Sequence, residues 1–148
     1  MSLKSNIIDD MKSAMRAKDK KQLGTIRLLT AAIKQIEVDE RKELSDADVV
    51  AIVVKMVKQR KDSTKQYQDA DRHDLADQEI YEIGVLEKYL PAQLSESDIE
   101  DLIKKAIAST DAKGMQDMGK VMGLLRPDLA GKADMGLVSQ KIKALLQA

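Results

Sequence analysis

Apolar residues recur at every third or fourth position along almost the whole chain, which is the spacing of one face of an α-helix. The first such stripe consists of Leu3, Ile7, Ile8, Met11 and Met15. Asp19, a residue type suited to cap a helix N-terminus, precedes a second stripe of Leu23, Ile26, Leu29, Ile33 and Ile36. We therefore predict one helix along the first stripe and a second that ends in the charged segment Glu37–Glu43.

The β-branched run at residues 49–54 is typical of a buried strand when it stands alone. Two neighbouring features favour a helix instead. Ser45 can cap a helix whose third residue is Asp48, and a polar helical pattern continues over residues 55–71. We predict a third helix of about 25 residues, roughly 37 Å long at 1.5 Å per residue.

A fourth helical pattern begins at about Asp74 and is expected to stop at Pro91, because proline has no N–H with which to continue a helix. Directly afterwards, Ser95 and Asp98 repeat the arrangement of a cap followed by an acid at the third helical position. A new helix, and with it a new structural unit, is therefore predicted after Pro91.

The C-terminal part of the chain differs in composition from the rest. Five of the seven glycines fall there, at Gly114, Gly119, Gly123, Gly131 and Gly136. This favours short helices joined by glycine turns, followed by a final amphipathic helix. We predict an all-α protein with a four-helix N-terminal domain at residues 1–92 and a smaller three-helix domain at residues 93–148.

Residue types that the sequence lacks exclude several kinds of chemistry. Cysteine is absent, which excludes disulfides, thiolate catalysis and cysteine-ligated metal sites. The single histidine, His73, lies at a polar junction between two helical patterns, where we expect an exposed turn residue. Phe and Trp are absent, which argues against stacking of single-stranded bases on aromatic side chains. We predict no catalytic residue, no metal site and no cofactor.

The longest uncharged apolar run, residues 49–54, is far shorter than the roughly 20 residues that a membrane-spanning helix needs. No segment combines a basic start, an apolar centre and a small-residue cleavage site, so no secretory signal is recognised. We expect a cytoplasmic protein with no membrane partner.

Positive and negative charges cancel in the sum, with 25 of each, but they are unevenly distributed. Residues 4–34 hold eight Lys or Arg against three Asp or Glu, and residues 55–65 hold five against one. Acidic residues predominate at 37–48, six to two, and at 69–87, seven to one. Two interpretations stay open: a basic surface that attracts phosphate, or solvated helix faces with local ion pairs.

The segment 114–121 has the G-x-x-x-x-G-K spacing of a phosphate-binding loop. Val121 stands where the magnesium-binding Ser or Thr is required, so we do not expect a nucleotide site. Gly119 and Gly123 are four residues apart and share a helix face, which permits close approach of another backbone. That backbone is either a neighbouring helix or a nucleic acid, with Lys120 supplying charge in the second case.

Several segments resemble the bacterial YqeY family. In the N-terminal half they are Asp10-Met11-Lys12, Ala14-Met15-Arg16-Ala17-Lys18-Asp19-Lys20, Arg27-Leu28-Leu29, Gln59-Arg60-Lys61 and the Glu79-x-x-Glu82 spacing. The most specific is Tyr89-Leu90-Pro91-Ala92-Gln93-Leu94-Ser95, and the C-terminal ones are Asp117-Met118-Gly119-Lys120-Val121-Met122-Gly123 and Gly131-Lys132-Ala133-Asp134. The sequence departs from the family pattern at Met135, which stands before Gly136 where the family often has Gly directly after the aspartate.

The C-terminal part of that family is similar to the tail domain of the GatB subunit of the tRNA-dependent amidotransferase, which amidates Glu-tRNA(Gln) or Asp-tRNA(Asn). The resemblance implies a two-part helical protein whose C-terminal domain is directed at tRNA. It also implies carbon–nitrogen ligase activity with glutamine as amide donor. Because the chain lacks residues for that chemistry, we expect an accessory protein that is not catalytic alone.

The residues expected to contact RNA combine lysines with glycines at turns or on an open face: Lys113, Gly119, Lys120, Gly123, Gly131, Lys132, Lys141 and Lys143. A second basic face is expected at Lys58, Lys61 and Lys65, whose spacing places them on one side of a helix. Expected partners are tRNA and an amidotransferase or other translation-related protein, but not DNA. The alternatives are a protein–protein interaction module with no RNA ligand and a subunit that supports amide transfer only within a complex.

Overall fold

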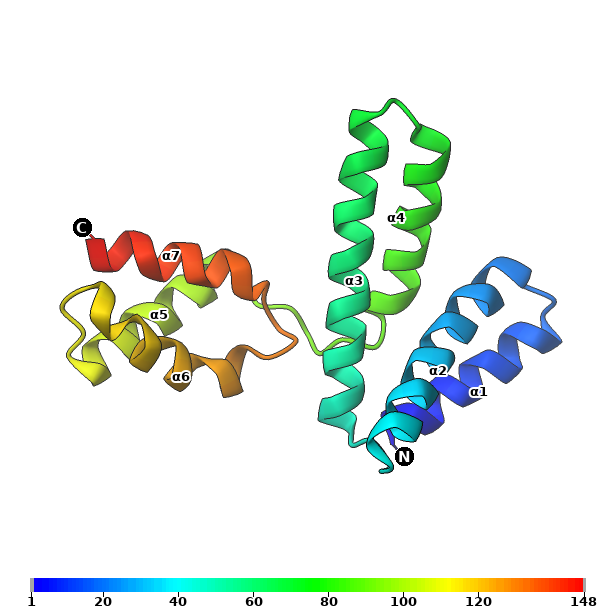
Figure 1. The fold of residues 1–148 in the computed structure, drawn as a ribbon, viewed down its shortest axis with the longest axis horizontal. Helices are drawn as coiled ribbons and strands as arrows, with labels where there is room; N and C mark the ends of the chain where they lie inside the picture. The colour runs from blue at the N-terminus through cyan, green and yellow to red at the C-terminus, as the bar shows by residue number, and fades with distance from the viewer. Residues whose placement is uncertain (1, 148) are drawn as a thin grey trace. The chain divides into compact units, whose positions relative to one another are not determined.

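The computed structural model describes residues 2–147, which form seven α-helices and one 3₁₀ turn without any strand (Figure 1). The chain divides into two compact units, Met1–Leu90 and Pro91–Ala148. The first contains α1 (Leu3–Arg16), α2 (Lys20–Glu40), α3 (Asp46–Asp69) and α4 (His73–Glu87). The second contains α5 (Glu96–Thr110), η1 (Met115–Asp117), α6 (Met118–Leu129) and α7 (Met135–Gln147). The predicted all-α class, with four helices followed by three, is confirmed.

The contact-based division lies between Leu90 and Pro91, two residues before the predicted boundary between residues 92 and 93. The independent folding of the two units remains a prediction. Over the described residues, no helix is both long and apolar enough to span a bilayer.

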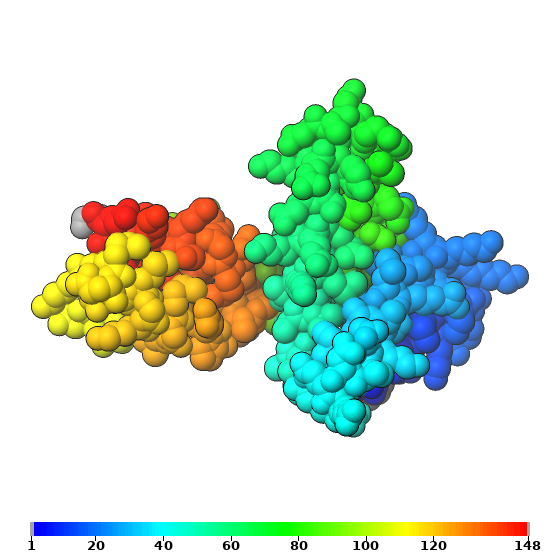
Figure 2. All heavy atoms as spheres, viewed as in Figure 1, coloured from blue at the N-terminus to red at the C-terminus, as the bar shows by residue number. Residues whose placement is uncertain are grey.

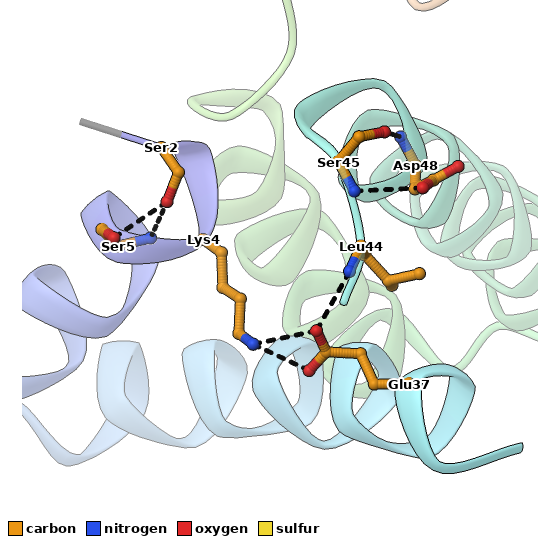
Figure 3. Close-up of polar contacts among 7 residues, drawn as sticks. All are labelled: Ser2, Lys4, Ser5, Glu37, Leu44, Ser45 and Asp48. Atoms are coloured by element: carbon orange, nitrogen blue, oxygen red, sulfur yellow. Dashed lines mark hydrogen bonds and ion pairs between the residues drawn. The ribbon is translucent and has the colours of Figure 1, made fainter. Parts of the chain in front are cut away.

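The helix starts follow the capping residues found in the sequence. The Asp19 carboxylate accepts a hydrogen bond from the Gln22 backbone N–H at 3.1 Å. Ser45 and Asp48 form a reciprocal capping box, in which each side chain accepts from the other residue's backbone N–H (Figure 3). Ser95 accepts from the backbone N–H of Asp98 and so starts α5. Local sequence therefore determines where these three helices begin.

The predicted fourth helix extends three residues too far, since α4 ends at Glu87 rather than at Leu90, directly before Pro91. Tyr89 N–H then donates to the Leu86 carbonyl and Leu90 N–H to the Glu87 carbonyl, which are tighter turns than those of an α-helix. The residue before a proline is sterically driven away from helical geometry. Tyr89, only 8% exposed, packs in the core of the first unit beside Val85 and Leu86.

The core of the first unit lies where all four helices meet. It is built mainly from Ile7, Ile26, Leu29, Ile33, Val49, Val53 and Leu86, each at most 2% exposed. The α3 helix contributes only residues from its first half, and toward the far end of the α3–α4 hairpin the buried apolar residue is Ala76. Figures 1 and 2 show this far end, coloured green, extending beyond the blue and cyan helices α1 and α2.

The second unit has its own core between α5, α6 and α7. The innermost residues are Ile103, Val121, Leu129, Val138 and Ile142. The prediction that the glycines would join short helices is correct only in part: Gly119 and Gly123 lie inside α6, and Gly136 lies inside α7. The apolar residues of α6 recur at four-residue spacing, and their burial holds that segment helical despite the two glycines.

Candidate nucleic-acid interface

The α6 helix has one face in the core and one face in solvent. Val121, Leu125 and Leu129 are buried, whereas Gly119 and Gly123 are exposed. A Cβ atom added to either glycine would meet no heavy atom within 4 Å. Within the described residues of the second unit, no neighbouring helix packs against this face, so the helix-packing interpretation of the two glycines is wrong for that unit.

An exposed glycine in a helix interior costs about 1 kcal/mol relative to alanine, because it loses more backbone freedom on folding. Gly119 and Gly123 lower the stability of α6 in this way, and within the described residues of the second unit no close contact offsets the loss. Their bare backbone is accessible to a molecule outside the chain.

Lys120 lies beside this open face, and its side chain is 71% exposed. Its Nζ atom is 3.9 Å from Asp117 Oδ1, at the outer limit of an ion pair. Asp117 has a second role, because its Oδ2 atom accepts from the Lys113 backbone N–H at 3.0 Å. One carboxylate thus holds the Lys113 backbone and lies beside the Lys120 ammonium at the start of α6. Lys113 Nζ is itself 3.6 Å from Asp111 Oδ2, in an exposed pair, and both lysine side chains are more than 70% exposed.

Lys132 lies beyond the opposite end of α6, a helix about 18 Å long at 1.5 Å per residue. Gly131 adopts a left-handed backbone with φ of 74°, which glycine tolerates without a Cβ clash. The Lys132 carbonyl accepts from Leu94 N–H at 3.0 Å, and Gln93 Nε2 donates to the Gly131 carbonyl at 2.7 Å. These bonds fix the backbone of the turn while the Lys132 side chain stays exposed.

Lys141 differs from the other lysines predicted to contact RNA. Its side chain is 18% exposed, and Nζ lies 3.0 Å from Glu96 and 3.1 Å from Glu100. Hydrogen bonds to these carboxylates, Glu96 first, raise the pKa of Lys141 above its usual value. Lys141 therefore joins α7 to α5, and its charge is already balanced. Lys143 is exposed, with no carboxylate of the described residues within 4 Å of its ammonium.

The second predicted basic face lies on α3. Lys58, Lys61 and Lys65 are all exposed, as their spacing indicated. Lys61 Nζ is 4.0 Å from Glu87 on α4, which is a weak, solvent-screened pair. Within residues 2–147, Lys58 and Lys65 have no ion-pair partner. This face belongs to the first unit.

Two pairs of residues that carry the family resemblance have a structural role that sequence reasoning missed. Arg60 Nε donates to Glu82 Oε2 at 3.2 Å between α3 and α4, and both side chains are nearly buried. The Tyr89 hydroxyl donates to Asp10 Oδ2 at 2.6 Å. Spacing along one helix cannot reveal partners on another helix, and nothing else in the sequence marks these pairs.

The N-terminal resemblance thus includes residues that hold helices together, whereas Gly119, Lys120 and Gly123 on α6 face solvent. The sequence matches the family described as Yqey-like protein over residues 4–146. The chain belongs to the YqeY family. The resemblance noted in the sequence is confirmed.

Curated relatives of this YqeY-family chain include fungal proteins named "Altered inheritance of mitochondria protein 41, mitochondrial". The protein from Pyrenophora tritici-repentis is 32% identical over 94% of this chain and 78% of its own length. The one from Candida glabrata is 34% identical over 91% of this chain and 72% of its own length. The match to the Clavispora lusitaniae protein, 35% identical, covers 67% of this chain and 58% of that protein.

Proposed function

We propose that this YqeY-family chain is an RNA-binding accessory protein that uses its C-terminal unit to bind tRNA. The observation that carries the proposal is the solvent-facing backbone of α6 at Gly119 and Gly123, with the exposed ammonium of Lys120 beside it. A polyanionic backbone needs cations within contact distance and no side chains that hold it away. This face of α6 supplies both.

The candidate RNA surface consists of Lys113, Gly119, Lys120, Gly123, Gly131, Lys132 and Lys143. Lys141 is left out of it, because Glu96 and Glu100 already neutralise that ammonium. The second unit as a whole carries eight basic and eight acidic residues, so attraction to RNA must come from local charge rather than net charge. Contacts to phosphates and to folded shape suit a chain without Phe or Trp.

The proposal includes no catalytic step in this chain. The carbon–nitrogen ligase activity implied by the family resemblance is assigned to a partner, with the tRNA-dependent amidotransferase or another translation-related protein as the class expected. We propose a cytoplasmic location for this protein, whereas the names of its fungal relatives place those proteins in mitochondria.

The direct test measures the affinity of the full chain for fluorescently labelled tRNA by anisotropy. Lys120→Glu together with Lys132→Glu reverses two charges of the candidate RNA surface and should weaken binding at least about tenfold, or 1.4 kcal/mol. The matched control is Lys104→Glu with Lys105→Glu, which makes the same charge change on exposed α5 positions and should change affinity much less.

A second pair of variants tests the open helix face itself. Gly119→Leu and Gly123→Leu place bulky side chains where the structure has free space, so the fold should persist. Binding of tRNA should nevertheless fall, because the side chains keep a phosphate backbone away from α6. Unchanged affinity in both the lysine and the glycine variants would reject the RNA proposal and favour the protein-interaction alternative.

A further inference from the structure

A groove of about 400 Å³ runs between α1 and α2, in the first unit. Its apolar residues are Ile7, Ile8, Met11 and Ile33. Ile7 and Ile33 belong to the buried core and form the floor, whereas Ile8 and Met11 are partly exposed. The volume lies within the range of about 300–1,000 Å³ that is usual for ligand sites.

One end of the groove is closed by an ion pair. Lys4 Nζ lies 2.8 and 2.9 Å from the two carboxylate oxygens of Glu37, and Glu37 Oε2 also accepts from the Leu44 N–H at 3.1 Å (Figure 3). The bonds from Lys4 and Leu44 lower the pKa of Glu37. The carboxylate of this end is thus satisfied inside the protein and does not repel an anionic ligand as an isolated charge would.

The unpaired charge that lines the groove is positive. Its charged lining residues are Lys4, Lys34 and Glu37, of which Lys4 and Glu37 form the ion pair described above. The carboxylates of residues 4–34 lie elsewhere: Asp9 and Asp10 line a separate hollow with Tyr89, and Asp19 caps α2. Lys34 lies at the rim, is exposed, and has no carboxylate of the described residues within 4 Å.

We propose that this groove binds an acidic amphipathic helix of a partner protein. The apolar floor fits apolar side chains, which RNA phosphates do not supply, and the unpaired ammonium of Lys34 at the rim attracts a carboxylate beside them. From Lys4 to Met11 the groove is about 10 Å long, two turns of a helix. The partner therefore presents apolar residues at i, i+3 or i+4, and i+7, and the flexible side chain of Met11 adapts to them.

The proposal concerns a different surface from the candidate RNA surface and does not depend on it. The test uses the full chain and two labelled peptides of about 16 residues, each with Leu at i, i+4, i+7 and i+11. One peptide carries Glu and Ala at the other positions, and the second carries Lys in place of every Glu. The acidic peptide should bind at least about tenfold more tightly than the basic peptide. This ratio of affinities should fall as the salt concentration rises, because salt screens the charges.

Two variants locate the binding. Met11→Glu places a charge in the groove and should abolish binding of the acidic peptide. Lys34→Glu changes an exposed rim residue without disturbing the core and should shift the preference toward the basic peptide. Lys20→Glu makes the same charge change in the same hairpin but outside the groove, and should leave the preference as it is.

Equal affinity for the two peptides, no binding of either, or a preference that Lys34→Glu leaves unchanged would overturn the proposal. If neither peptide binds and Lys34→Glu instead weakens tRNA binding, the hairpin is a nucleic-acid surface. The α6 variants are not expected to affect peptide binding, so failure of this proposal is distinguishable from failure of the proposed RNA function.

Discussion

The Tyr89 hydroxyl donates a hydrogen bond of 2.6 Å to Asp10, across 79 residues of sequence. Burial and the neighbouring carboxylate raise the pKa of Tyr89 above its usual value, so the hydroxyl remains a donor to a higher pH than that of an ordinary tyrosine. This bond attaches the turn after α4 to α1 just before the chain enters the second unit. The bond thereby fixes the short turn between the end of α4 at Glu87 and Pro91.

Replacement of Tyr89 by Phe removes the hydroxyl and leaves the ring. We expect a loss of about 1 kcal/mol in the free energy of unfolding, the lower part of the range for bonds to charged groups because Asp10 is exposed. Urea denaturation of the full chain, followed by circular dichroism, measures this loss. An unchanged unfolding midpoint would show that the bond contributes nothing in solution.

The nearly buried pair of Arg60 and Glu82 gives a second prediction. Glu82→Gln leaves the Arg60 guanidinium without its ionic partner, at side-chain exposures of 14% and 13%. We expect a destabilisation of about 2 kcal/mol, between the values for surface and buried pairs. Glu87→Gln is the matched control, because it disrupts the exposed pair with Lys61 between the same two helices and should cost less than about 0.5 kcal/mol. Equal effects of the two variants would contradict this assignment.

Glu79, which lies near this pair, makes stability depend on pH. Burial first, and then the charge of Glu82, raise the pKa of Glu79 above 4.5. The folded chain then binds this proton more tightly than the unfolded chain, so the contribution of Glu79 to stability falls as the pH rises through its folded pKa. Glu79→Gln should therefore gain stability over the parent chain at pH 7, by less than about 1 kcal/mol, and lose that advantage at pH 3. Unfolding curves at the two pH values measure the difference, and an advantage larger at pH 3 would contradict the sign.

The helical class and several helix starts followed from local sequence, because Asp19, Ser45 and Ser95 each bond to a backbone N–H within three residues. The contacts between helices could not be predicted from local sequence. Glu82 meets Arg60 across 22 residues, and only the folded hairpin brings the two together. The spacing of Gly119 and Gly123 placed them on one helix face, but the cause of that helix is burial of apolar residues on the opposite side of α6 rather than the propensity of glycine.

For the candidate RNA surface too, the sequence predicted some features of the lysines but not their ion pairs. Spacing indicated correctly that Lys58, Lys61 and Lys65 are exposed, but composition could not separate Lys141 from Lys143. The difference arises because Glu96 and Glu100 on α5 lie beside Lys141 in the folded second unit. An ammonium paired with two carboxylates is unsuited to phosphate binding. Only the tertiary structure reveals that Lys141 is paired in this way.

The open face of α6 predicts an unusual response to alanine. Gly119→Ala and Gly123→Ala add methyl groups that meet nothing within 4 Å, and should each stabilise the chain by about 0.5–1 kcal/mol. Thermal unfolding measures this gain. If both substitutions destabilise the chain instead, the α6 glycines have a structural role that the absence of neighbouring atoms does not explain.

The second unit should fold by itself when it starts at Pro91. Gln93 and Leu94 bond to the turn at Gly131 and Lys132, so a fragment that starts at residue 95 lacks these bonds and should be less stable. Both fragments have marginal cores at about 55–60 residues. Circular dichroism with thermal melting compares them. A random-coil spectrum of residues 91–148 would contradict independent folding.

The salt dependence of tRNA binding tests the central proposal most directly. If Lys113, Lys120, Lys132 and Lys143 each neutralise one phosphate, the logarithm of the affinity of the full chain should fall against the logarithm of salt concentration with a slope of about −3 to −4. Lys120→Glu with Lys132→Glu should flatten that slope by roughly two units. A slope near zero for the parent chain, or a slope that the double variant leaves unchanged, would contradict RNA binding through this surface.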